Sequence, residues 1–229
     1  MSIVKNLVLS AALAVGTLAG ATTASAAVLQ YNGLAGNGVV SVSGTGPDYT
    51  GRGGAFKMGD ATDALGLGTS FIAFCLDLTG TVQTGFEYVI NNVNPFQPGR
   101  ELSALQRQNV EDLFDASYGS VDVNNNIDGA AFQLALWEAG YETDAGPLSL
   151  TAGTRIGSSS AAILARANEY LGNMVTWDGT NNYNVNFLDA NVDARQDLVM
   201  ASPVPVPAAG LLMLTGLGGI AALRRRKKA

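Results

Sequence analysis

The sequence predicts an α+β domain in which a β-sheet, barrel-like framework carries a helical insert. Three observations predict this fold class. Residues 28–93 are rich in strand-forming side chains and turn signals, residues 103–171 repeat apolar side chains at helical spacing, and residues 183–201 return to strand-forming residues. A signal peptide at the N-terminus and a single transmembrane sorting helix at the C-terminus are predicted to flank this domain.

The first part of the domain is predicted to consist of strands. GVVSVSG (38–44) alternates apolar and polar residues, FEYVINNV (86–93) is rich in β-formers, and turns are predicted at 44–48 and at the glycines of 51–54. The most apolar strand is FIAFCLDL (71–78). Because side chains alternate along a strand, Phe74 is expected to face the core, while Cys75 and Asp77 share the other face.

Three helices are predicted to follow. The first begins at a capping box of Ser103 and Gln106 and runs to Tyr118. The second is predicted over 129–139 with Asp128 as its N-cap, and the third over 160–171 with a serine N-cap. The segments 183–190 and 196–201 then complete the predicted sheet.

Both ends of the chain read as export signals. Residues 1–26 combine an early lysine, an apolar run and Ala24-Ser25-Ala26, the pattern that signal peptidase cleaves. Residues 203–229 combine a proline motif, an apolar run over 208–223 and a basic tail. Those 16 residues would span about 24 Å as a helix, against a hydrocarbon core of roughly 30 Å. The predicted domain therefore covers 27–202 and lies outside the cytoplasm, held transiently by the C-terminal helix.

Composition excludes several function classes. Residues 27–203 contain seven basic and 19 acidic residues, a formal charge of −12, so nucleic acid is not an expected partner. The chain has no histidine, which rules out a Ser-His-Asp triad and an imidazole zinc site. The single cysteine rules out an intramolecular disulfide. No cofactor and no metal site is expected.

Cys75, the single cysteine, and Gln133 are candidate functional residues. An unpaired thiol in an oxidising compartment is a liability unless it is buried, cross-linked or modified. Gln133 and Trp137 lie four residues apart and share a helix face, so the indole can cover the carboxamide. Each feature alone also suits ordinary core packing, a small buried hydrophobe and an apolar core helix.

Taken together, these motifs resemble bacterial surface thioester domains. Phe74-Cys75-Leu76 is similar to the aromatic-Cys-apolar motif of that family, and the segment FQLALW (132–137) is similar to its downstream glutamine motif. The resemblance implies an internal thioester between Cys75 and Gln133 that is attacked by an amine, such as a lysine on a target surface. Such a protein turns over once, so it is not expected to be an enzyme.

The remaining site residues have supporting roles in this hypothesis. Without histidine, a carboxylate must move the thiol proton, and Asp77 is the best candidate, with Glu138 as a weaker one. Phe74 and Trp137 are expected to keep water away from the bond. The run Asp122, Asn124, Asn126 and Asp128 resembles a calcium loop, but it lacks the glycine and the distal glutamate that an EF-hand needs.

The tail VPVPAAGLLMLTGLGGIAALRRRKK resembles PEP-CTERM sorting signals of the VPLPA type. This resemblance implies processing by an exosortase-type enzyme and a final location at the cell surface or outside the cell. The predicted function is covalent adhesion to amine groups. The alternative left open is a non-reactive structural or carbohydrate-binding protein of the exopolysaccharide or biofilm matrix.

Overall fold

The computed structural model describes residues 25–92, 101–190 and 195–205. Within these residues the strands are β1 (Ala26–Gly44), β2 (Tyr49–Gly59), β3 (Ser70–Cys75), β4 (Phe86–Ile90), β5 (Arg155–Ser159), β6 (Tyr183–Ala190) and β7 (Leu198–Pro203). The helices are α1 (Ala104–Ser117), the 3₁₀ turn η1 (Tyr118–Ser120), α2 (Asn126–Tyr141) and α3 (Ala161–Thr176). The predicted signal peptide (1–26) and sorting signal (203–229) lie almost wholly outside the described residues.

The prediction of a mixed fold, rich in sheet and carrying helices, is confirmed. The strands form a seven-stranded sheet in the order β2-β3-β7-β6-β4-β1-β5, and β1 also pairs with β2. The sheet is not a clear barrel, and the long strand β1 pairs with three neighbours. The N-terminal end of β1 pairs with β4, its middle with β2 and its C-terminal end with β5, with register shifts between Tyr31 and Asn37.

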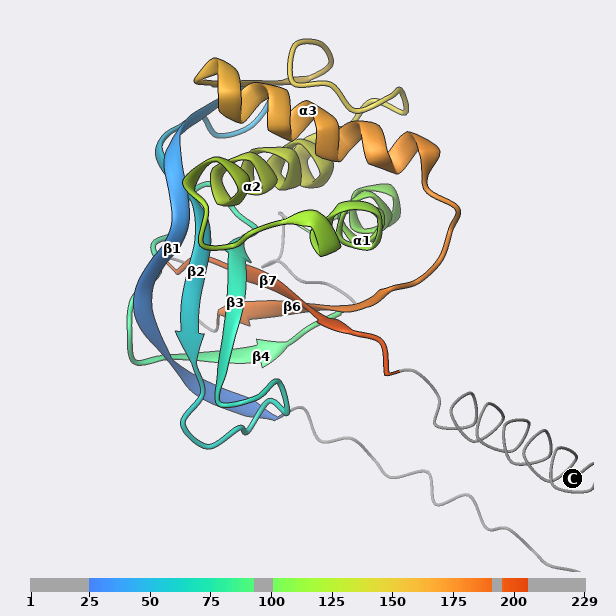
Figure 1. Cartoon of the computed structure of the whole chain (residues 1–229). Coiled ribbons are helices and arrows are strands. Elements are labelled where there is room, and N and C mark those ends of the chain that lie inside the picture. The colour runs from blue at the N-terminus through green and yellow to red at the C-terminus, as the bar shows by residue number, and fades with distance from the viewer. Residues whose placement is uncertain (1–24, 93–100, 191–194, 206–229) are drawn as a thin grey trace, which may run out of the picture.

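Helix α2 lies between α3 and the strands, with α1 beside it (Figure 1). All of its residues from Gly129 to Gly140 are buried. A helix buried on every side needs apolar or hydrogen-bonded residues all round, which explains why this segment lacks a polar face. Gln133, Glu138 and Glu142 are therefore polar groups held inside or beside the core.

Three local predictions are corrected by the structure. The glycines of 51–54 lie in β2 and form no turn there, since β2 pairs with β1 through these residues. The strand β5 has no counterpart in the sequence prediction. The helix α2 begins at Asn126, and its N-cap is Asn125, whose side chain accepts bonds from the N–H groups of Ile127 and Asp128.

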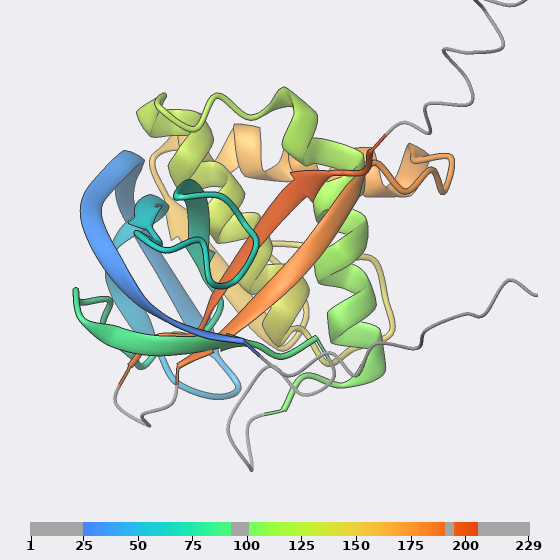
Figure 2. The same ribbon diagram turned by 90° about the horizontal axis from the view of Figure 1, so that it is seen from below.

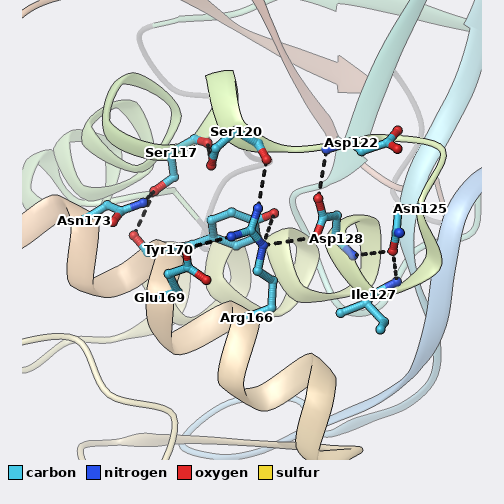
Figure 3. A network of polar contacts seen from close by, with 10 residues as sticks. All are labelled: Ser117, Ser120, Asp122, Asn125, Ile127, Asp128, Arg166, Glu169, Tyr170 and Asn173. Atoms are coloured by element: carbon cyan, nitrogen blue, oxygen red, sulfur yellow. Dashed lines mark hydrogen bonds and ion pairs between the residues drawn. The ribbon is translucent and has the colours of Figure 1, made fainter.

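Asp128 has a different role from the predicted N-cap. Its carboxylate forms an ion pair with Arg166 of α3 (3.0 Å) and accepts a bond from the Asp122 N–H (Figure 3). Arg166 also contacts Glu169 and donates to the Ser120 carbonyl. This network fastens α3 to the loop that precedes α2, and the Asp128 side chain is the member of the alternating Asp and Asn residues that takes part in it.

Candidate functional site

The end of β3 and the middle of α2 bring Cys75 and Gln133 together. The backbone N–H of Cys75 donates to Gln133 Oε1 (2.9 Å), and Gln133 Nε2 donates to the Cys75 carbonyl (2.8 Å). Cys75 is 4% exposed and Gln133 is fully buried. The two residues are 58 positions apart in the chain, so only the tertiary fold creates this contact.

The contact arises because the sheet cannot satisfy the backbone of Cys75 at this point. The next residue, Leu76, donates its N–H to the Asp197 carbonyl at the start of β7. The N–H and C=O of Cys75 are bonded by a side chain, and the carboxamide takes the place of a neighbouring strand. Since buried backbone groups need partners, Gln133 stabilises the end of β3 whatever chemistry follows.

Asp77 lies two residues beyond Cys75 and is 1% exposed. Its Oδ1 accepts bonds from the N–H groups of Thr79 and Gly80, and its Oδ2 accepts one from the Asp197 N–H (2.9 Å). Burial first, and then the negative charge of Asp77, raise the pKa of the Cys75 thiol well above its ordinary value. The thiol is therefore protonated at rest, with a carboxylate within electrostatic range.

Trp137 lies one turn beyond Gln133 and is 1% exposed. Its ring contacts that of Tyr49 on β2, with 5.0 Å between the centroids. A Cβ atom on Gly53 would come within 2.6 Å of Val40 Cγ2, 3.1 Å of Gln133 Cγ and 3.3 Å of Trp137 Cζ3. The missing side chain of Gly53 thus lets β2 lie directly against Gln133 and Trp137 and closes this side of the site.

The other two predicted site residues lie in different surroundings. The Phe74 ring packs against Phe132, at 4.9 Å, and against Phe114 and Tyr118. Glu138 accepts a bond from the Ser149 N–H (2.8 Å), and burial raises its pKa to about 7. The structure therefore places Phe74 in an aromatic core cluster and Glu138 toward the segment before β5. Neither side chain has a described polar contact with Cys75 or Gln133.

Three tyrosines near Cys75 were not predicted from the sequence. Burial and then the negative charge of a Cys75 thiolate raise the pKa of Tyr31 on β1 and of Tyr49 on β2. The same two influences act on Tyr88 of β4, where the charge of Asp197 also contributes, and this hydroxyl donates to the Gln196 carbonyl. Tyr31 and Tyr49 are half-buried, so they form the part of the surroundings that reaches solvent.

No metal site and no membrane-spanning helix is found among the described residues. No group of three or more histidine, cysteine or acidic side chains in this part of the chain is placed to hold a metal ion. Within the same residues, no helix combines the length and the apolar character needed to cross a bilayer. The predicted transmembrane helix over 208–223 lies outside them.

Comparison with known proteins gives structural matches alone. No family model and no curated protein matches the chain. The chain is similar to the N-terminal domain of the Streptococcus pyogenes pilus tip adhesin Cpa, with 14% identity, a TM-score of 0.40 and coverage of 72% of this chain and 94% of that one. It is also similar to the N-terminal thioester domain of a Clostridium perfringens surface protein, with 14% identity, a TM-score of 0.39 and coverage of 73% and 100%. A third similar structure is the N-terminal thioester domain of fibronectin-binding protein SfbI from Streptococcus pyogenes, with 13% identity, a TM-score of 0.42 and coverage of 72% of this chain and 94% of that one. At these identities and TM-scores the function has to be inferred from the site itself.

Proposed function

We propose that Cys75 and Gln133 form an internal thioester and that the domain uses it once, to bind covalently to an amine on a target surface. The observation that carries this proposal is the pair of hydrogen bonds between the Gln133 carboxamide and the Cys75 backbone. Because both bonds run to one residue, the edge of the carboxamide faces the Cys75 backbone, and its carbon, which carries both bonded atoms, is held close to Cys75. Rotation about the Cα–Cβ bond of Cys75 decides whether its sulfur is directed at that carbon.

Formation of the bond is a balanced exchange of a thiol for ammonia. The Cys75 sulfur attacks Cδ of Gln133 and forms a tetrahedral intermediate, and the C–N bond then breaks. The thiol proton goes to the leaving nitrogen, which departs as ammonia. The Cys75 N–H, 2.9 Å from Oε1, is at the distance at which a donor stabilises the negative charge that develops on this oxygen.

Asp77 is the proposed carrier of the thiol proton. Its negative charge opposes formation of a thiolate beside it, whereas transfer of the proton to Asp77 leaves a thiolate beside a neutral acid. The carboxylate is held by three backbone N–H groups, so its position relative to the strand end is fixed. With no histidine in the chain, this carboxylate is the general base that the site offers.

The surroundings of the bond suit a slow reaction with water and a selective reaction with an amine. Gln133 is fully buried beneath Trp137 and β2, and the half-buried Tyr31 and Tyr49 lie toward solvent. In the second step an amine nitrogen attacks the thioester carbon, the C–S bond breaks and the Cys75 thiol takes up a proton. The products are an amide on Gln133 and a free thiol, so the domain acts as a single-use adhesin and not as an enzyme.

Export and surface sorting belong to the same proposal. The supporting features are the residues of 1–26 and 203–229, with their signal-peptide pattern, proline motif, apolar run and basic tail. We infer that an exosortase-type enzyme processes the tail and that the domain faces the outside of the cell. Mapping both ends of the exported protein by mass spectrometry tests this, and an intact tail on the mature protein would contradict it.

The intact mass of the purified protein tests the thioester. Loss of ammonia lowers the mass by about 17 Da relative to the processed sequence. Incubation with methylamine should then add the mass of methylamine and release one thiol that iodoacetamide can alkylate. Cys75→Ala and Gln133→Ala should each show the full sequence mass and no reaction with methylamine.

Two results would contradict the proposal, each for a different reason. A full mass together with an unreactive, buried Cys75 would show that Gln133 serves only to satisfy the backbone of β3. A lowered mass that does not change on incubation with methylamine would show a thioester that is buried too deeply to react with amines on a target surface.

A further inference from the structure

A large polar groove lies on a different part of the domain from Cys75. It has a volume of about 640 Å³ and lies between α1, the end of β4, strands β6 and β7 and the loop that follows β2. Figure 2 shows β6 and β7 passing beside α1 in this region. Its polar lining includes Asn92, Asn184, Asn186, Gln108 and Glu111. None of these residues has a role in the thioester site.

A second depression adjoins the groove. It has a volume of about 530 Å³ and shares the lining residues Asp115 and Tyr183 with the first. Its lining adds Ser120, Asn182 and Gly119. The two hollows, together called the trench, follow one another along α1 and β6, and such an elongated surface suits a chain-like ligand better than a compact one.

Amide side chains dominate the chemistry of the trench. Each Asn or Gln offers two N–H donors and a carbonyl acceptor, which matches a hydroxyl group that both donates and accepts. Asn184 and Asn186 alternate along β6, about 7 Å apart. Asn186 accepts a bond from Asn92 and donates to the Met200 sulfur, so Asn184 is the amide of this pair that is placed to contact a ligand. Asn184 is exposed, whereas Asn186 is half-buried.

The charges of the trench argue against an anionic ligand. Among the residues that the structure describes, no lysine or arginine lines either hollow, while Glu111 and Asp115 do. Asp115 is held in place by the N–H groups of Asn182 (2.7 Å) and Tyr183 (2.8 Å). Burial raises the pKa of Glu111, and nearby Asp112 and Asp115 raise it further against the opposing effect of Arg107. A phosphate, sulfate or uronate group would find no counter-charge among these residues.

We infer that this trench binds a neutral polysaccharide chain through Asn184 of β6 and the carboxylate of Glu111. Glu111 accepts bonds from sugar hydroxyls, and the exposed Asn184 exchanges donors and acceptors with them. The site is independent of the thioester, so a protein without the Cys75–Gln133 bond binds the same polysaccharide. Together, the two sites allow a covalent anchor and a reversible glycan contact on one domain.

Affinity electrophoresis tests this inference with defined probes. The full-length protein is run through gels that contain galactomannan, dextran or mixed-linkage β-glucan, and in parallel through polygalacturonate. At least one neutral polymer should retard the protein, and polygalacturonate should not. Asn184→Ala should weaken the retardation about five- to tenfold, the effect of losing one or two hydrogen bonds.

Matched variants separate the trench from the rest of the surface. Asn168→Ala removes an exposed asparagine of α3 that lines neither hollow, so it should bind as the original protein does. Cys75→Ala should also bind unchanged. Failure of every neutral polymer, equal retardation of Asn184→Ala and the original protein, or stronger retardation by polygalacturonate would each overturn the inference.

Discussion

Replacing Cys75 by alanine should reveal the thioester as a large loss of stability. A bond between Cys75 and Gln133 closes a loop of 58 residues. By the loop-closure relation used for disulfides, such a cross-link stabilises a domain by about 4 kcal/mol. Without the cross-link, Cys75→Ala removes only one buried sulfur atom and costs about 1 kcal/mol. In a protein without the thioester, both hydrogen bonds of Gln133 go to the backbone of residue 75, so the substitution leaves them in place.

Urea unfolding of the two proteins measures the difference. The thioester hypothesis predicts a free energy of unfolding about 4–5 kcal/mol lower for Cys75→Ala, or a midpoint of thermal unfolding roughly 8–20 °C lower. Methylamine treatment of the original protein should cause most of the same loss without a mutation. A loss near 1 kcal/mol, with no effect of methylamine, would refute the reasoning.

Three further predictions concern the surroundings of the bond. Gly53→Ala should destabilise the domain by about 1–3 kcal/mol, because its Cβ would lie 2.6 Å from Val40 Cγ2 and 3.1 Å from Gln133 Cγ, and a displaced Gln133 should reduce the fraction of molecules that lose ammonia. Gly146→Ala, with open space around it, is the control, and equal mass spectra for both variants would contradict this. Glu138→Gln should remove a pH dependence of stability. The pKa of Glu138 in the folded protein, about 7, exceeds the ordinary 4.5, so the free energy of unfolding of the original protein falls on the order of 3 kcal/mol as pH rises from 4.5 through 7. Unfolding curves of the variant should not show this loss. Asp77→Asn should slow the appearance of the lowered mass in freshly folded protein by at least about tenfold; an unchanged rate would exclude Asp77 as the base.

The sequence predicts the fold class and most elements, because periodicity and caps are local signals. The capping box of Ser103 and Gln106 is confirmed at the start of α1. Asp128 was the wrong N-cap because Asn125 is equally suited by type, and the partner that engages Asp128, Arg166, is 38 residues away. The glycines of 51–54 suggest a turn by composition, yet they lie in β2 because α2 packs against that strand.

The candidate site, too, could be predicted only where its signals are local. Strand alternation over 71–78 predicts Asp77 on the same face as Cys75. The strand β3 ends at Cys75, so alternation does not extend to Asp77, yet the structure puts the charge of Asp77 within range of the thiol. The roles of Tyr49 and Gly53 depend on the register between β1 and β2 and on the place of α2 over them, and neither can be obtained from local sequence. The glycines of 51–54, which lie next to strand-forming residues, are the one signal that could have suggested a close approach at Gly53.

The hydrogen-bond geometry also bears on why the reaction would run in one direction. Gln133 uses its carbonyl oxygen and the N–H on the same side of the amide to contact one residue, Cys75. A primary amide always has an N–H in that position. A substituted amide, formed when an amine opens the thioester, has its alkyl group there in the favoured trans form, and the cis form costs about 2.5 kcal/mol. The product therefore cannot restore both contacts without this cost, and its amide carbon no longer rests against Cys75. Return of the thiol to that carbon is then opposed both by the low reactivity of an amide and by the loss of the alignment that favoured the first attack.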